Sequence, residues 1–256
     1  EKNNLKLPDL KVLNCGGSAM PRSTIKAFDD MGVEVRHAWG MTEMSPLGTV
    51  GALQGDFSHL QGDARLDRLQ MQGYAPFMVE MKITDDDGKE LPWDGKTPGR
   101  LKVRGPAISG AYYRIKDDIL DAQGFFDTGD VATIDEQGYM RITDRSKDVI
   151  KSGGEWISSI DLENLAVGHP KVAEAAVIGV PHPKWGERPL LILQLKERES
   201  VTREEILGFM DGKIASWWMP DDVATVDSIP HTATGKILKT ALREQFKDYK
   251  LPSAAA

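Results

Sequence analysis

Five consecutive residues, Trp39-Gly40-Met41-Thr42-Glu43, bring an aromatic ring, a hydroxyl group and a carboxylate close together. This combination suits the activation of a nucleotide: the ring can pack on adenine, the hydroxyl can bond an α-phosphate oxygen, and the carboxylate can hold Mg²⁺. The alternative is a core tryptophan followed by the cap of a helix. The residue types therefore make this segment a candidate nucleotide site.

Two charged side chains further along the chain fit the same chemistry. Asp130 ends the run Asp127-Thr128-Gly129-Asp130, and its carboxylate can accept two hydrogen bonds from the hydroxyl pair of a ribose. The alternative for Asp130 is an Asx bond in a hairpin turn. Arg145 follows on the expected returning strand, from which its guanidinium could reach the same sugar or its phosphate.

A cation and a glycine pair stand nearer the C-terminus. Lys236 ends the run Thr232-Ala233-Thr234-Gly235-Lys236, and a cation on such a loop could stabilise the charge that develops when a carboxylate attacks an α-phosphate. The run Ser152-Gly153-Gly154-Glu155-Trp156 offers bare backbone followed by a large ring, as a narrow tunnel for a pantetheine chain would require. A surface lysine and a plain β-turn are the respective alternatives.

These motifs, in this order, resemble the adenylate-forming enzymes over nearly the whole chain. Within that superfamily the chain is most similar to fatty acyl-CoA synthetases, whose Gly-Gly-Glu-Trp-Ile-Ser-Ser signature stands at residues 153–159. The resemblance implies ATP, Mg²⁺ and coenzyme A as cofactors, and a fatty acid or another small carboxylic acid as substrate.

The resemblance also assigns roles to individual residues. It implies that Lys236, Thr42 and Glu43 are catalytic, with Glu43 holding the Mg²⁺, and that Lys147 is the hinge on which the C-terminal domain turns. His37 is a candidate for the acyl pocket, although a structural histidine is the commoner case. The implied nucleotide-binding residues are Gly16, Gly17, Ser18, Trp39, Gly40, Met41, Thr42, Asp130 and Arg145. The implied CoA-binding residues are Gly153, Gly154, Glu155 and Trp156. Lys184 and Arg188 are candidate contacts to the CoA phosphates, with a solvated loop charge as the alternative.

The elements that must position these residues can be read from periodicity and turn signals. A strand over residues 11–15, a helix over 21–31 and a strand over 33–39 make one strand-helix-strand unit, and in such sheets ligands bind beyond the carboxyl ends of the strands. Short segments separated by Gly and Asp turns then predict a small barrel or bent sheet. Beyond Lys147, helices over residues 158–167 and 239–246, a capping box at 202–205 and strands over 172–180 and 223–226 predict an α+β domain.

The fold class is thus α/β and α+β. We expect residues 1–60 to end a large α/β adenylate-binding domain, residues 61–146 to form a small β-barrel-like subdomain, and residues 147–256 to form a mobile α+β domain.

Composition restricts the partners. The formal net charge of -7, with no block of Lys and Arg, argues against nucleic acid, and the single cysteine excludes an internal disulfide. No apolar stretch is long enough for a membrane span, so a soluble, cytoplasmic protein is expected.

Parts of the family pattern are absent from this chain. The Ser/Thr/Gly-rich phosphate loop and the N-terminal sheet that forms most of the acyl pocket have no counterpart, so we interpret the sequence as the C-terminal half of a synthetase, inactive by itself. Close relatives dimerise through that other half, which allows a homodimer.

The expected function is a fatty acyl-CoA ligase that makes acyl-AMP and then the CoA thioester, with medium or long chains favoured. The alternatives are an enzyme that serves a carrier protein and a non-catalytic nucleotide-binding module. The joint presence of Thr42, Glu43, Asp130, Arg145 and Lys236 argues against the non-catalytic module.

Overall fold

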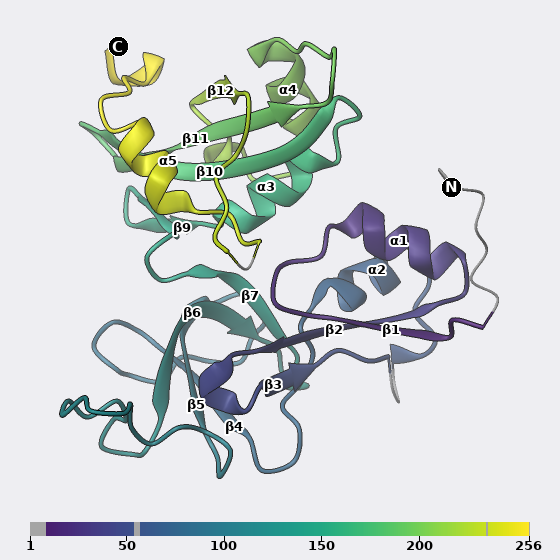
Figure 1. The fold of residues 1–256 in the computed structure, drawn as a ribbon, viewed down its shortest axis with the longest axis vertical. Coiled ribbons are helices and arrows are strands. Elements are labelled where there is room, and N and C mark those ends of the chain that lie inside the picture. The colour runs from purple at the N-terminus through teal and green to yellow at the C-terminus, as the bar shows by residue number, and fades with distance from the viewer. Residues whose placement is uncertain (1–8, 54–56, 234, 256) are drawn as a thin grey trace. The chain divides into compact units, whose positions relative to one another are not determined.

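The computed structural model describes residues 9–53, 57–233 and 235–255 (Figure 1). The chain divides into two compact units, an N-terminal unit that ends at Ile142 and a C-terminal unit that begins at Thr143. The boundary between them lies four positions before Lys147. Each unit is described by itself.

The first half of the N-terminal unit is a three-stranded sheet with two helices. Strand β1 (Val12–Cys15) pairs in parallel with β2 (Glu34–Gly40), and β3 (Leu47–Val50) pairs antiparallel with β2. Helix α1 (Arg22–Asp30) connects β1 to β2, which confirms the predicted strand-helix-strand unit. A small core forms where α1 and α2 (Gly62–Gln70) pack against the sheet, and its buried side chains are Met20, Ile25, Val35, Leu66 and Leu69.

The second half of this unit is an antiparallel sheet. Its strand order is β4-β5-β6-β7, and a closed barrel is not confirmed. The strands are β4 (Glu80–Thr84), β5 (Gly99–Arg104), β6 (Phe126–Ile134) and β7 (Met140–Arg145), whose last residues belong to the C-terminal unit. The core of this sheet includes Met44, which directly follows Glu43, and Trp39 and Met41 pack against its edge. The core thereby anchors the segment on which the predicted nucleotide contacts lie.

The C-terminal unit is a sheet with helices on both faces. Strands β10 (Val172–His182) and β11 (Gly186–Leu195) form a long antiparallel pair, which the short strands β8 (Ile150–Ser152), β9 (Glu155–Ile157) and β12 (Asp222–Val226) extend. Side chains of a strand alternate between the faces of a sheet. The helices are α3 (Ser159–Val167), α4 (Arg203–Met210) and α5 (Lys239–Gln245), with short 3₁₀ turns at Ser216–Trp218 and Pro252–Ala255.

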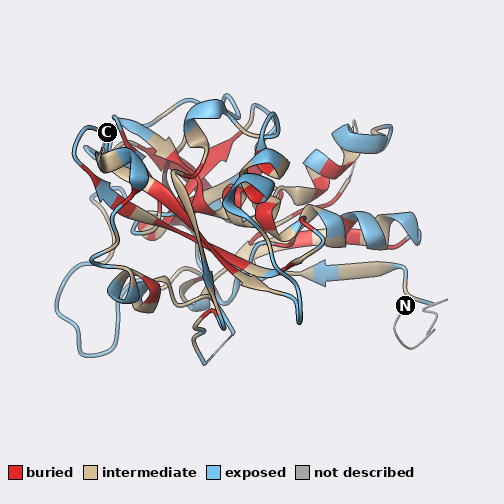
Figure 2. Cartoon of the chain, turned by 90° about the horizontal axis from the view of Figure 1, so that it is seen from above, coloured by how far each residue is buried: buried red, intermediate tan, exposed pale blue. Residues whose placement is uncertain are grey.

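The alternation along β10 and β11 separates two cores. Val177 and Leu191 pack with the buried residues of α3 and α4, whereas Ala176 and Leu190 pack with Leu242 of α5. Figure 2 colours the chain by burial, and the buried residues of both strands lie mainly in the middle of each strand. The sheet is therefore a rigid platform for the loops at its ends.

Two helix caps follow the sequence closely. Ser158 accepts a hydrogen bond from the Asp161 amide, and Thr202 accepts one from the Glu205 amide, as N-cap residues do. Among the helices of the described residues, none combines the length and the apolar character needed to cross a bilayer.

Candidate functional site

The two predicted nucleotide loops of the N-terminal unit begin at the same edge of a sheet. Gly16, Gly17 and Ser18 follow β1, and Met41 to Glu43 follow β2, which is the parallel neighbour of β1. Parallel strands place their carboxyl ends together, where ligands bind in open α/β sheets. Gly16 to Ser18 are exposed, so their backbone is accessible to a ligand.

Steric crowding explains why residue 40 is a glycine. A Cβ atom at this position would lie 1.9 Å from the carbonyl oxygen of Pro46, so only glycine allows the chain to turn back so closely into β3. The turn contains the 3₁₀ segment Thr42–Met44, in which Met44 is buried, Thr42 is exposed and Glu43 is half-buried. The buried methionine holds the turn while the two predicted catalytic side chains stay accessible.

Trp39 and Asp130 meet although they are 91 residues apart. The indole Nε1 of Trp39 donates a hydrogen bond of 2.8 Å to Oδ2 of Asp130, whose side chain lies on β6 and is buried. The predicted base contact and the predicted ribose contact are therefore neighbours. Arg145 is exposed at the end of β7 in the C-terminal unit, so its contact to the same sugar stays a prediction.

The carboxylate of Glu43 also has a distant partner. Tyr112, on the loop between β5 and β6, donates its hydroxyl to Oε1 of Glu43 at 2.7 Å, and the Ser109 amide donates to the Glu43 carbonyl at 2.8 Å. The hydrogen bond to Glu43 raises the pKa of Tyr112. The tyrosine thus keeps its proton and acts only as a donor to the carboxylate.

Glu43 has the chemistry of a magnesium ligand. Mg²⁺ in phosphate-transfer sites is held by one or two carboxylates together with substrate phosphates, and does not need an all-protein cage. Within residues 9–53, 57–233 and 235–255, no group of three His, Cys, Asp or Glu side chains forms a metal site. A single half-exposed carboxylate at the turn is compatible with a metal that arrives with a nucleotide.

His37 lies deeper than an exposed pocket wall. It is 2% exposed on β2, its Nδ1 lies 2.9 Å from the Gln70 carbonyl, and its Nε2 lies 3.3 Å from the Ser18 carbonyl. Gln72 contacts the same Nδ1 at 3.1 Å. This geometry ties the loop after β1 to the end of α2, and the acyl-pocket role stays a prediction.

The predicted CoA segments lie side by side in the C-terminal unit. Gly153 and Gly154 form the turn between β8 and β9, with φ values of 60° and 89° that favour glycine at both positions. The Gly153 amide donates to the Trp185 carbonyl at 2.8 Å, and Lys184 Nζ lies 4.4 Å from the centre of the Trp185 ring. Two loops that are about thirty residues apart in the sequence thus form one corner, in which Glu155 is exposed and Trp156 is half-buried.

Arg188 is held differently from its predicted neighbours. Its guanidinium donates to Asp221 Oδ1 at 2.6 Å, to Ser152 Oγ, and to the carbonyls of Trp217 and Met219. These four bonds use most of the five donors of an arginine. Arg188 thereby stabilises the corner from within, and a phosphate contact from it stays a prediction.

Lys236 lies on a tight exposed turn. The Thr232 amide donates to the Lys236 carbonyl at 2.8 Å, and the Lys236 amide donates to Thr232 Oγ1 at 3.2 Å. A bridge between His231 and Ile237 closes the turn, while Thr234 lies outside the described residues. The side chain is exposed, so this turn presents its ammonium group to solvent.

Helix α5, which begins three residues after Lys236, forms hydrogen bonds to the segment of the predicted hinge. Lys147 lies in the turn between β7 and β8. Arg243 of α5 donates to the Lys147 carbonyl at 3.2 Å and to Asp148 Oδ1 at 2.7 Å. The helix therefore connects the turn of Lys236 to the segment around Lys147.

A buried polar cluster, formed by Asp144, Ser159, Glu163 and Lys239, lies beside this segment. Lys239 Nζ forms an ion pair of 2.7 Å with Glu163 and also donates to Ser159 Oγ, which donates to Asp144. Burial raises the pKa of Asp144 and raises that of Glu163 to about 7, against the opposing effect of Lys239. A single cation thus offsets two buried acids.

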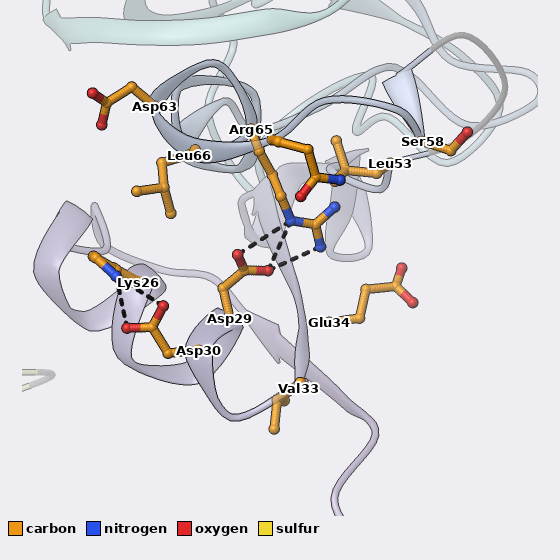
Figure 3. A pocket seen from close by; sticks show the side chains of 13 residues that line it. Lys26, Asp29, Asp30, Val33, Glu34, Leu53, Ser58, Asp63, Arg65 and Leu66 are labelled. Carbon is orange, nitrogen blue, oxygen red and sulfur yellow. Dashed lines mark hydrogen bonds and ion pairs between the residues drawn. The ribbon is translucent and has the colours of Figure 1, made fainter.

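A different part of the N-terminal unit holds a solvent-open pocket of about 700 Å³. Figure 3 shows Arg65 bonded to Asp29 and Lys26 bonded to Asp30 within its wall. Gly32, Val33 and Glu34 place it at the start of β2, whereas the predicted nucleotide residues follow the end of that strand. None of the predicted site residues lines it.

Sequence reasoning did not find several of these partners. Tyr112 gives no local signal, because a lone tyrosine in a loop is common. Lys239, Glu163 and Arg243 occur at ordinary helix positions, and only the packing of α5 against α3 and the β7–β8 turn brings them together.

Comparison with known proteins agrees with these features. A family model described as AMP-binding enzyme matches residues 1–113, and one described as AMP-binding enzyme C-terminal domain matches residues 161–236. A 3-methylmercaptopropionyl-CoA ligase of Ruegeria lacuscaerulensis is 54% identical over 96% of this chain and 46% of its own length. A medium-chain-fatty-acid–CoA ligase of Ectopseudomonas oleovorans is 44% identical over 99% of this chain and 47% of its own length.

A solved structure shares the fold. The ATP-bound MatB from Rhodopseudomonas palustris superposes with a TM-score of 0.79 at 31% identity, over 93% of this chain and 46% of that protein. The chain spans about half the length of the curated relatives it matches.

Proposed function

Because this chain belongs to the adenylate-forming enzymes, we propose that the full-length protein containing it is an AMP-forming acyl-CoA ligase. The observation that supports this most is the grouping of predicted contacts in the N-terminal unit. Two loops follow parallel neighbouring strands, and Trp39 bonds to Asp130, so the residues predicted to contact base, phosphate and ribose lie near the end of β2. The ATP bound to the MatB relative is consistent with a nucleotide there.

In the first step, a carboxylate oxygen of the acid attacks the α-phosphorus of ATP. The bond between the α-phosphorus and the bridging oxygen breaks, pyrophosphate leaves, and acyl-AMP remains. Thr42 contacts an α-phosphate oxygen, and Lys236 stabilises the charge that develops on the phosphoryl group. Glu43, oriented by Tyr112, would hold the Mg²⁺ that neutralises the phosphates.

In the second step, the thiol of CoA attacks the acyl carbon. The bond from this carbon to the phosphate oxygen breaks, AMP leaves, and the thiol proton passes to solvent. The corner of Gly153, Gly154, Trp156 and Lys184 would guide the pantetheine chain. A rotation about Lys147 would exchange Lys236 for this corner between the steps, which a hinge of few residues permits.

The proposed substrate class rests on the names of the relatives more than on the residues of this chain. One relative is named for a medium-chain fatty acid and another for the short sulfur-bearing acid 3-methylmercaptopropionate. We propose a medium or long straight-chain acid first, with the sulfur-bearing acid as the second candidate.

The test measures AMP and thioester together. The full-length protein is given ATP, CoA and one acid at a time, from acetate to palmitate and including 3-methylmercaptopropionate. Thioester that rises with AMP would support the ligase and rank its substrates. Acid-dependent pyrophosphate release without thioester would favour a carrier protein as acceptor, and no turnover with any acid would favour a binding module.

A further inference from the structure

The bond between Trp39 and Asp130 has a fixed direction. An indole N–H can only donate a hydrogen bond, so the Trp39 ring must be oriented with this group toward Asp130. The Asp130 side chain is 3% exposed, and a buried carboxylate needs donors to offset the loss of water. At 2.8 Å, the indole supplies one of them to Oδ2.

The orientation of the Trp39 ring depends on Gly48. A Cβ atom at Gly48, on β3, would lie 2.4 Å from Cζ3 and 2.6 Å from Cε3 of Trp39, and 2.5 Å from Cε of Met44. No real side chain tolerates such distances, so the missing side chain at this position leaves the space that the ring occupies. The ring is also packed against the core of the β4–β7 sheet. Gly48, Trp39 and Asp130 therefore form a continuous contact from β3 through β2 to β6.

We propose that Trp39 is a positioning residue for ribose recognition, seated on Gly48. This proposal rests on the proposed function, because it takes Asp130 as the contact to the hydroxyl pair of the nucleotide. By bonding Oδ2, the indole fixes the rotamer of Asp130, so that the carboxylate meets the 2′ and 3′ hydroxyls without first reorganising. A carboxylate has about four acceptor sites, and the bond to Trp39 occupies one of them.

The proposal separates two roles of one side chain. If Trp39 only packs against the base, its loss weakens every adenine nucleotide equally. If it positions Asp130, its loss weakens only nucleotides that carry the ribose hydroxyls. The ratio of the affinities for AMP and for 2′,3′-dideoxy-AMP therefore isolates the second role.

The experiment is calorimetric binding of these two ligands to the full-length protein. Trp39→Phe keeps an apolar ring and removes the N–H group. AMP can donate its ribose hydroxyls to the charged carboxylate of Asp130, whereas 2′,3′-dideoxy-AMP cannot. We therefore expect the wild-type protein to bind AMP about tenfold or more tightly than the dideoxy ligand. In Trp39→Phe we expect this preference to shrink to about two- to threefold, with little change in the affinity for the dideoxy ligand.

Two further variants make the result specific. Gly48→Ala should reduce the preference for AMP over the dideoxy ligand in the same way, because the added methyl group displaces the Trp39 ring. Trp93→Phe makes the same chemical change at the other tryptophan of the N-terminal unit and should leave the preference unchanged. Thermal unfolding of each variant shows whether it is folded. An unchanged preference in folded Trp39→Phe, or an equal loss of both ligands, would overturn the proposal.

Binding and turnover keep the two proposals apart. Ribose-selective AMP binding without turnover of any acid would refute the ligase and leave the role of Trp39 intact. Thioester formation by a protein with no preference for AMP over the dideoxy ligand would overturn the role of Trp39 and leave the ligase intact. Absence of AMP binding in the wild-type protein would overturn both.

Discussion

In the N-terminal unit, Asp130 and Glu43 each accept a hydrogen bond from a side chain far away in the sequence, 91 and 69 positions respectively. In the C-terminal unit, Lys236 lies on a turn whose closing bonds join residues only four positions apart. The first arrangement fixes side chains before a ligand arrives. The second fixes only a backbone turn and leaves the charged side chain to solvent.

This difference matches the demands of the two predicted tasks. A binding site gains from groups that are already oriented, because less ordering has to occur on binding. A residue that must approach for one step and withdraw for the next cannot be tied to a rigid partner. Just beyond this turn, Lys239 at the start of α5 is held in the buried cluster beside Lys147.

The largest expected effect concerns Lys236. In the full-length protein, Lys236→Ala should lower acid-dependent ATP–pyrophosphate exchange by about 10³-fold, since an electrostatic stabiliser of the transition state is removed. Thioester formation from supplied acyl-AMP should change little. Lys247→Ala, at an exposed lysine paired with Glu244, is the matched control. Equal losses in both steps would argue against a role for Lys236 in adenylation.

The buried cluster should respond in stability. Lys239→Met removes the cation between two buried acids while keeping a chain of similar length, and should lower the free energy of unfolding by about 3 kcal/mol. Hydrogen exchange of the α3 amides reports this locally. Adding Glu163→Gln should recover part of the loss, because one buried charge goes with it. Exchange as slow as in the wild-type protein would show that the ion pair with Glu163 contributes nothing net.

A substitution at the predicted hinge, Lys147, should have a smaller effect on the rate than Lys236→Ala and should affect only one of the two steps. Lys147→Pro restricts φ of a residue that lies in the turn between β7 and β8, and should slow thioester formation by up to about 10²-fold while sparing adenylation. Single-turnover assays of the two steps measure this. Lys147→Ala, which removes the side chain at the same position without restricting φ, is the matched control. Unimpaired overall turnover would count against a hinge at Lys147.

The smallest expected effect concerns the hydrogen bond from Tyr112 to Glu43 in the N-terminal unit. Tyr112→Phe removes the donor to Glu43 and should lower adenylation about fivefold, the usual net contribution of one hydrogen bond. The concentration of Mg²⁺ that gives half-maximal rate should rise with it. Tyr113→Phe changes the neighbouring side chain, which is 84% exposed, and serves as the matched control. If the two variants behave alike, the contact with Glu43 has no function.

Much of the fold was predictable because the signals were local. The strand-helix-strand unit, the capping box at Thr202, the helix that begins at Ser158 and the glycine turn at Gly153-Gly154 each depend on residues within a few positions. The strand ends could also be placed, because parallel neighbours share an edge. The barrel could not be established, since closure depends on strand pairing that short alternating segments do not specify.

The sequence by itself determined which residues are candidates for nucleotide and acyl-transfer chemistry and where along the chain they stand, because motif order and spacing are properties of the chain. Only the tertiary structure decided which of them have partners: Trp39 with Asp130, Tyr112 with Glu43, and Arg188 with Asp221. It also decided that Gly48 leaves room for a ring and that Lys239 lies between two acids. The physical reason is that hydrogen bonds, ion pairs and steric contacts act over a few ångströms, while these partners are separated by tens of residues along the chain.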